Sequence, residues 1–372
     1  LNRRFTNFQL MTPGVVAFPT SLTAASAENP QGSYRMLVNG QSFAGTSHLL
    51  DGTDNHDAVL GWIVINPTLE SVTEAKITTA NYDAEFGVAS AGVVSAQTKS
   101  GTNAMHGSLF EFLRNEKLNA RNFFSNTVPP FKRNQFGGTF GGRVIRDKTF
   151  FFVSYQGTRD RSAPGAQTAN VLTAAERRGD FSGLARAITD PAANNQPFPN
   201  RTIPASRISQ PSIKFLDAFV PLPNRADGLL SFASQQANDQ DNTIFKIDHQ
   251  VSNANRLSGR YLINRESFLE VPGSLPNMFA NIKYSNYNLS LTDTHILSAS
   301  LLNNFQFTFN DIDRRQLSVV PGNVTWNDFG AKKVMKAAAP RAPRPISRAT
   351  GAPNTSVAAA FIKTCNQEPC VN

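Results

Sequence analysis

Residues 135–144 read QFGGTFGGRV, and in this stretch two kinds of residue alternate. Phe136 and Phe140 fall on one side of the alternation, whereas Gln135 and Thr139 fall on the other. Successive side chains of a β-strand point to opposite faces of the sheet, so this period of two predicts a strand. Its two faces are expected to meet different surroundings, one apolar and one polar.

The same period recurs between residues 106 and 320. It is clear at residues 243–251, 256–264 and 299–310, and weaker around Glu111 and at residues 148–157 and 286–295. We therefore expect about seven antiparallel strands in this region.

Such strands suit either a soluble sheet with its apolar face inward or a membrane barrel with its apolar face towards lipid. The connections separate these alternatives, because long and short ones alternate strictly. Short turns are expected at residues 146–147, 252–254 and 297–298, and the longest connection is a loop at about residues 158–242. Outer-membrane barrels place short turns on one side of the membrane and long loops on the other. Residues 106–320 are therefore predicted to be the N-terminal part of an antiparallel transmembrane β-barrel.

Residues 1–105 differ, because short apolar stretches are broken there by glycine and polar turns. We expect short strands near residues 35–38, 48–50, 76–80 and 93–98. Residues 67–75 predict the start of a helix, since Pro67 suits an early helical position and Glu70 and Glu74 suit the positive end of the helix dipole. The segment is predicted to be a small α+β domain.

Charge and cysteine are concentrated near the C-terminus. Of the net charge of +9 over 372 residues, residues 331–372 contribute +6, with seven basic residues and one acidic residue. Cys365 and Cys370 also lie there. This Pro- and Ala-rich sequence has no strand or helix period, so we expect residues 321–372 to be a disordered basic tail or an artefactual end. The rest of the chain is nearly neutral, which argues against a nucleic-acid partner.

Other classes of protein are excluded by composition and motif. The longest apolar run, residues 58–65, is far shorter than the roughly 20 residues of a membrane-spanning helix. No phosphate-binding loop, nucleophile elbow or dinucleotide fingerprint is present, so we predict no catalytic residue, no cofactor and no enzyme activity.

Two sets of polar residues are candidate sites. Asp51, Asp54 and Asp57 cluster carboxylates that could hold a cation, although the spacing does not match a calcium loop and a polar turn is the simpler interpretation. On the polar side of the expected strands, four charged residues would line the lumen or contact the preceding domain: Arg143, Lys246, Asp248 and Arg260.

Several composite motifs carry a family resemblance over roughly residues 1–320. The stretches 70–76, 81–87, 92–94, 98–103 and 106–107 resemble the plug domain of TonB-dependent outer-membrane receptors, and the nearest match is their Oar-like branch. The stretches 118–124, 132–138, 147–152 and 179–182 resemble the barrel strands and first large loops of that branch. The plug motif residues are Asn81, Tyr82, Glu85, Phe86, Gly87, Lys99, Ser100, Gly101, Thr102, Asn103, His106 and Gly107. Residues 100–103 are expected to be a turn joining plug to barrel, with Gly101 supplying a positive φ.

The resemblance implies a plug that occludes a barrel in the outer membrane of a Gram-negative bacterium. It further implies partners in the TonB complex, the outer-membrane lipid and an unknown extracellular ligand, with the long loops meeting a bulky ligand first. Plugged transporter barrels have 22 strands, so seven strands would be an internal piece that lacks the TonB-contacting segment. A surface adhesion or glycan-binding β protein without transport is the alternative, and a basic nucleic-acid binder driven by the tail is a weaker one.

Overall fold

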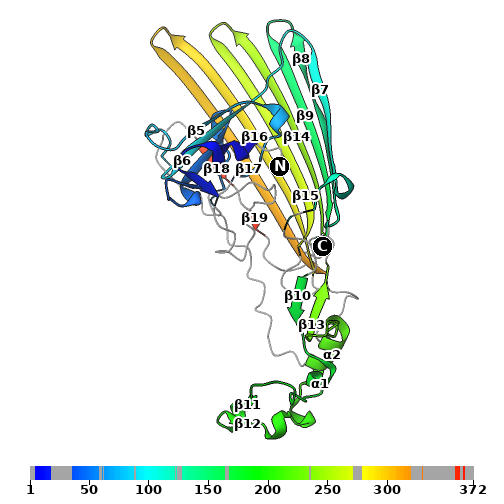
Figure 1. The fold of residues 1–372 in the computed structure, drawn as a ribbon. Coiled ribbons are helices and arrows are strands. Elements are labelled where there is room, and N and C mark those ends of the chain that lie inside the picture. The colour runs from blue at the N-terminus through cyan, green and yellow to red at the C-terminus, as the bar shows by residue number, and fades with distance from the viewer. Residues whose placement is uncertain are drawn as a thin grey trace.

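Seven long antiparallel strands form one large sheet in the computed structural model (Figure 1). The strands follow one another in chain order: β7 (His106–Asn115), β8 (Phe131–Ile145), β9 (Thr149–Ser162), β14 (Gln236–Ser252), β15 (Asn255–Glu270), β16 (Phe279–Ser298) and β17 (Leu301–Val319). All seven predicted strands are confirmed, and most are longer than the periodicity indicates. The structure describes residues 5–17, 36–57, 61, 63–87, 89–121, 123, 128–163, 167–233, 236–270, 279–319, 329, 357–360 and 363–364.

The strand connections alternate in length as predicted. Two or three residues separate β8 from β9, β14 from β15 and β16 from β17, and these short turns lie at one end of the sheet (Figure 1). The long β9–β14 connection lies at the other end. Asp147 takes a positive φ of 58° in the β8–β9 turn, which is the left-handed conformation that tight hairpins require.

The two faces of the large sheet differ in chemistry. On β14, Ile244, Lys246 and Asp248 are buried on the face that we call inner, while Phe245 and Ile247 on the outer face are exposed. On β14, the outer-face side chains from Thr243 to Val251 would cover about 20 Å along the membrane normal if the strand is tilted by about 40° from it. Because the exposed face is the apolar one, the sheet has the arrangement of a barrel wall that faces lipid.

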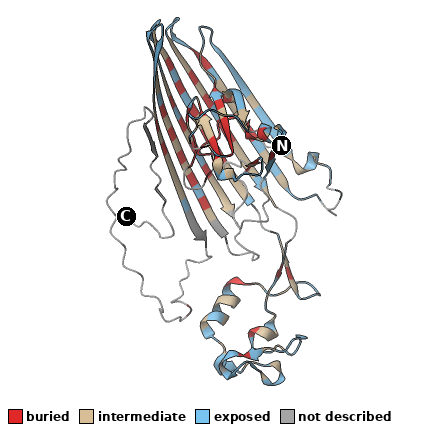
Figure 2. Ribbon diagram, turned by 90° about the vertical axis from the view of Figure 1, so that its left-hand side faces the viewer, coloured by how far each residue is buried: buried red, intermediate tan, exposed pale blue. Residues whose placement is uncertain are grey.

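The described residues between 5 and 105 form a separate unit, the N-terminal unit, that packs against the inner face (Figures 1 and 2). Its main sheet has the order β4-β3-β6-β5, with β3 and β6 parallel and the other pairs antiparallel. Its elements are η1 (Phe5–Met11), β1 (Val15–Ala17), β2 (Met36–Val38), η3 (Phe43–Gly45), β3 (Thr46–Leu50), β4 (Thr53–Asp54), η4 (Leu69–Ser71), β5 (Val72–Thr78) and β6 (Gly92–Thr98).

The helix expected at residues 67–75 is wrong. Leu69–Ser71 forms a single 3-10 turn, and β5 then runs from Val72 to Thr78. Val72 and residues 74–78 pair antiparallel with β6, with a register shift at Thr73, so sheet pairing and β-branched side chains outweigh the favourable N-terminal charges. No α-helix occurs in the described part of residues 1–105, and the expected α+β character is therefore absent from it.

The β9–β14 connection has its own secondary structure and is called the loop unit (residues 167–233). Its elements are β10 (Gln167–Asn170), α1 (Ala174–Arg177), β11 (Thr189–Asp190), η6 (Pro191–Ala193), β12 (Gln196–Pro197), η7 (Pro199–Arg201), η8 (Ala205–Arg207), α2 (Gln210–Phe219) and β13 (Leu229–Phe232). Arg177 is buried and donates to the carbonyls of Leu216 and Val220 at 3.0 and 2.6 Å, which satisfies the C-terminal end of α2.

Two smaller features complete the fold. η5 (Glu116–Leu118) follows β7, and β18 (Val357–Ala360) and β19 (Lys363–Thr364) pair parallel with β17. Most of the expected tail at residues 321–372, including both cysteines, lies outside the described residues, so its disorder stays a prediction. None of the helices that the structure describes is long and apolar enough to cross a bilayer.

Introducing a charged residue on the outer face tests whether that face contacts lipid. Ile247 is 56% exposed at mid-height, and Ile247→Lys is expected to destabilise the chain in phosphatidylcholine vesicles by about 2–4 kcal/mol. The free energy of unfolding from vesicles would be measured by urea titration. Leu184→Lys, an exposed leucine of the loop unit, is the control and should change it little. Equal losses in the two variants would contradict a lipid-facing outer surface.

Candidate functional site

A cluster of three charges joins the N-terminal unit to the inner face. Arg260 of β15 pairs with the Asp51 carboxylate, and its guanidinium also donates to the Leu50 carbonyl at 2.8 Å. Lys246 Nζ lies 3.5 Å from Asp51 Oδ1 and donates to Thr98 Oγ1 at 3.1 Å. Arg260 is 2% and Lys246 7% exposed, so one carboxylate serves two buried cations.

The backbone of the β3–β4 turn places Asp51 for this role. Asp51 and Gly52 both have positive φ, 51° and 78°, which turns the chain so that the carboxylate faces β6 and the large sheet. Thr98 donates to it from its backbone nitrogen at 2.7 Å and from its hydroxyl at 2.6 Å. Burial alone would raise the pKa of Asp51, but the charges of Arg260 and Lys246, with the Thr98 hydrogen bonds, outweigh burial and lower it.

Polar side chains of the inner face also bind backbone carbonyls of the N-terminal unit. Asn242 Nδ2 donates to the Asn66 carbonyl at 3.0 Å, and Asn286 Nδ2 donates to the Val64 carbonyl at 3.1 Å. The hydroxyls of Thr68 and Ser154 lie 3.1 Å apart. The two asparagine contacts satisfy backbone carbonyls that would otherwise be buried without partners.

An apolar core spans the same boundary. Leu50, Ile65 and Ala96 of the N-terminal unit share one buried cluster with Ile244 of β14 and Leu262 of β15. Figure 2 shows buried residues both in the N-terminal unit and along the strands behind it. The N-terminal unit and the sheet are therefore held together by apolar contacts as well as by charge.

The connection from β6 to β7 lies tightly against the large sheet. A Cβ on Gly101 would lie 2.3 Å from the Phe151 carbonyl oxygen and 2.4 Å from that of Gly142, so only glycine fits. Gly101 does not have the positive φ that the expected turn requires. Glycine is needed here because the chain passes so close to these two carbonyl oxygens. Asn103 completes the joint, since its Oδ1 accepts from the Asp147 backbone nitrogen at 2.9 Å.

The remaining plug motif residues lie in two places. Lys99 donates its backbone nitrogen to Ser71 at 2.8 Å, and Thr102 donates its hydroxyl to the Ala104 carbonyl at 3.0 Å. A second group lies in the exposed β5–β6 connection, where Tyr82 donates to the Ala89 carbonyl at 3.2 Å. The first group, between β6 and the start of β7, also contains Ser100, His106 and Gly107. The second group, in the β5–β6 connection, also contains Asn81, Glu85, Phe86 and Gly87.

The four predicted lumen-facing residues share the inner-face side of the strand register. Lys246 and Arg260 lie directly opposite each other and contact the N-terminal unit. Asp248 is buried and pairs with Arg256 at 3.1 Å. Arg143 has the same orientation by register but is exposed. Sequence reasoning did not select the inner-face asparagines as site residues, although these five all occupy the polar side of the alternation and are buried: Asn242, Asn264, Asn286, Asn288 and Asn310.

Two of the three candidate metal ligands have other roles, and the third, Asp57, is buried. Asp51 is committed to the two cations, and Asp54 Oδ1 accepts from the His56 backbone nitrogen at 3.1 Å. No group of three or more potential ligand residues is arranged to hold a metal within the part of the chain that the structure describes. Close by, the His48 and His56 rings stack at 6.1 Å, and burial, followed by the charge of His56, lowers the pKa of His48 to about 3.

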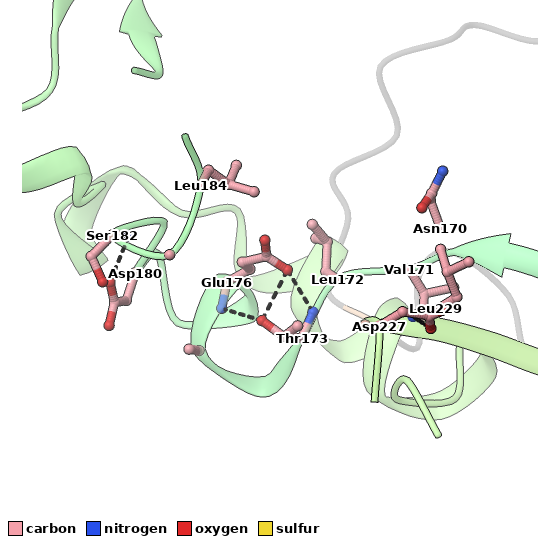
Figure 3. A pocket seen from close by; sticks show the side chains of 13 residues that line it. Asn170, Val171, Leu172, Thr173, Glu176, Asp180, Ser182, Leu184, Asp227 and Leu229 are labelled. Atoms are coloured by element: carbon pink, nitrogen blue, oxygen red, sulfur yellow. Dashed lines mark hydrogen bonds between the residues drawn. The ribbon is translucent and has the colours of Figure 1, made fainter. Parts of the chain in front are cut away.

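The loop unit contains a cavity of about 750 Å³ (Figure 3). Leu172, Leu184 and Leu229 contribute apolar lining, and Asp180 and Glu176 contribute carboxylates. Both carboxylates already have local partners, because Asp180 accepts from the Ser182 nitrogen at 3.0 Å and Glu176 completes a capping box with Thr173, the residue before α1. The volume is in the range of small-molecule sites.

Neutralising Asp51 tests the charge cluster. Asp51→Asn leaves two cations buried without a carboxylate, and we expect local opening of β3 and β6 to become easier by about 3 kcal/mol. Native-state hydrogen exchange measures this free energy. Asp54→Asn is the matched control, since burial raises the pKa of Asp54 and its hydrogen-bond acceptor is retained. Adding Arg260→Met to Asp51→Asn should restore part of the loss, and equal effects of the two single variants would refute the cluster's role.

The buried histidine gives the N-terminal unit a pH dependence. Because the folded-state pKa of His48 is about 3 against 6.5 when unfolded, the open state binds more protons below pH 6.5. Stability of β3 is therefore expected to fall from about pH 6.5 towards pH 3, whereas the Asp51 contribution is lost only below its ordinary pKa of 3.8. Protection factors measured at pH 7 and pH 4.5 should differ less in His48→Gln than in the unaltered chain. His106→Gln, at an exposed histidine, is the control, and a pH slope unchanged by His48→Gln would contradict this account.

Comparison with known sequences supports the outer-membrane assignment. Residues 97–370 match the family model described as an outer membrane beta barrel domain. The chain is 29% identical over 140 residues to the TonB-dependent transporter Oar of Myxococcus xanthus, which confirms the resemblance to the Oar-like branch. This alignment covers 36% of the chain and 13% of the relative.

A solved outer-membrane transporter shows the same fold, and a second match is weaker. The outer membrane transporter YddB from Escherichia coli matches 82% of the chain with a TM-score of 0.50 at 13% identity, and the chain covers 36% of it. The ferric enterobactin receptor PfeA from Pseudomonas aeruginosa, a mutant form, matches 84% of the chain with a TM-score of 0.41 at 11% identity, over 43% of that receptor. These relatives are transporters and receptors rather than enzymes. The chain belongs to the outer membrane β-barrel domain family, and its setting is the outer membrane of a Gram-negative bacterium.

Proposed function

We propose that residues 1–105 are a plug, that residues 106–320 are the first part of the barrel wall, and that the whole receptor takes up a bulky ligand in an energy-coupled step. The observation that carries this proposal is the packing of the N-terminal unit against the polar inner face, through the Asp51 cluster and the shared apolar core. The Oar relative, named as TonB-dependent, supports the TonB complex as the source of energy.

The contacts across this boundary suit a plug that is held firmly and can be moved. The cluster and the asparagine contacts are polar, and groups facing a lumen can exchange such partners for water when the plug shifts. The tight joint at Gly101 fixes the other end of the unit to β8 and β9. Movement would therefore begin at the cluster and leave the joint in place.

The loop unit supports a role in first contact with the ligand. It lies at the end of the sheet opposite the short turns and contains a cavity of about 750 Å³ (Figure 3). The same observation also favours the second candidate, a surface adhesion or glycan-binding protein that binds through this unit without transport.

Energy-coupled movement is testable without knowing the ligand. Ser154 is buried under Thr68, so a cysteine there should react with a maleimide only when the plug moves. In cells producing the whole receptor with Cys365→Ser and Cys370→Ser, we expect Ser154→Cys to label several-fold faster in energised cells than after a protonophore. Ala169→Cys, buried in the loop unit, should label at one rate in both states.

A disulfide provides the complementary control. The hydroxyl oxygens of Thr68 and Ser154 are near enough for Thr68→Cys and Ser154→Cys to be bridged. The bridged plug should stay closed, and a reductant should restore energy-dependent labelling of the freed cysteines. Identical labelling of Ser154→Cys with and without energy would refute the transport mechanism and favour adhesion.

A further inference from the structure

Three basic side chains gather on the outer face of the large sheet, away from the N-terminal unit. Lys283 of β16 lies directly opposite Arg315 of β17, and Arg265 of β15 lies directly opposite Ser285, two residues from Lys283. Diagonal neighbours of this kind are about 7–8 Å apart, within reach of long side chains. All three side chains are exposed, and we call them the basic triad.

Among the described residues, the nearby acids pair with at most one member of the triad. Asp241, directly opposite Arg265, is held by Arg159 at 2.8 Å and by the Tyr155 hydroxyl at 2.6 Å. Asp313 pairs with Arg315 at 2.9 Å. Among the described residues no ion pair involves Arg265 or Lys283. Like charges directly opposite each other destabilise a sheet, so the Lys283–Arg315 pair favours an anion between its members.

The position of the triad indicates which anion. Tyr261 and Tyr287 stack at 6.4 Å on the outer face, and tyrosines mark the border between apolar belt and headgroups in such barrels. Ile263 lies directly opposite Tyr287 and so marks the same border on β15. Arg265 lies two residues beyond Ile263, and Lys283 lies four residues from Tyr287. The triad therefore begins about 7 Å past this border along the strands. It lies towards the end that carries the long connections, which is the outer side of the membrane.

We propose that the basic triad binds the phosphates of a phosphorylated glycolipid headgroup in the outer leaflet. Arginine offers paired donors that match phosphate oxygens, and lysine adds a point charge. The apolar belt next to the triad accommodates the acyl chains of the same lipid. This site requires neither plug movement nor uptake, so it is independent of the proposed function.

Binding of labelled lipid A to the full chain in phosphatidylcholine nanodiscs tests the site. The variant Arg265→Gln, Lys283→Gln and Arg315→Gln is expected to bind bisphosphorylated lipid A about tenfold or more weakly. The control variant Arg146→Gln, Lys148→Gln and Arg186→Gln removes the same charge from exposed residues elsewhere and should bind as the unaltered chain does.

A gain-of-binding variant guards against damage to the fold. Asp313→Asn removes the acid that pairs with Arg315, and lipid A should then bind more tightly. Lipid A stripped of phosphate, and phosphatidylglycerol at matched charge, should bind more weakly than bisphosphorylated lipid A. Equal loss in the two triple variants, or equal binding of the dephosphorylated lipid, would overturn the site. Equal binding of phosphatidylglycerol would overturn its assignment to the outer-leaflet glycolipid.

Discussion

The carboxylate of Asp51 lies between two cations that the large sheet buries on its inner face. A sheet that turns its apolar side chains towards lipid must turn its polar side chains inward, where they need water or protein partners. Lys246 and Arg260 meet this constraint through a single carboxylate of the N-terminal unit. The position of that unit depends on this neutralisation, since an uncompensated buried charge costs several kcal/mol.

The apolar and polar contacts of the boundary have different consequences. Ile244 and Leu262 project from the inner face into the core of the N-terminal unit, which gives the association a non-directional contribution. The asparagines that bind the carbonyls of Val64 and Asn66 add direction, because each requires one donor to face one acceptor. Together these contacts favour one position of the unit, and the polar ones can be replaced by water if it moves.

Much of the site was predictable from local pattern, and its central pairing was not. Alternation placed Lys246 and Arg260 on the inner face because strand orientation depends only on neighbouring residues. The same reasoning treated Asp51 as a candidate metal ligand, since its true partner Arg260 is 209 positions away. Gly101 was identified as a joint for the wrong reason. Gly101 has no positive φ. Larger residues are excluded there because two carbonyl oxygens of the large sheet lie too close for a Cβ atom.

The sequence by itself determined the strands, their order, the short turns and the two chemically distinct faces, because each depends on residues close together in the chain. The tertiary structure alone decided that residues 72–75 belong to a strand instead of a helix, since pairing with β6 supplies what local propensity cannot. It also decided that Asp51 meets Arg260 and that Arg265, Lys283 and Arg315 gather on one surface. Those contacts follow from cross-strand register and from packing between distant segments, for which a single sequence carries no periodic signal.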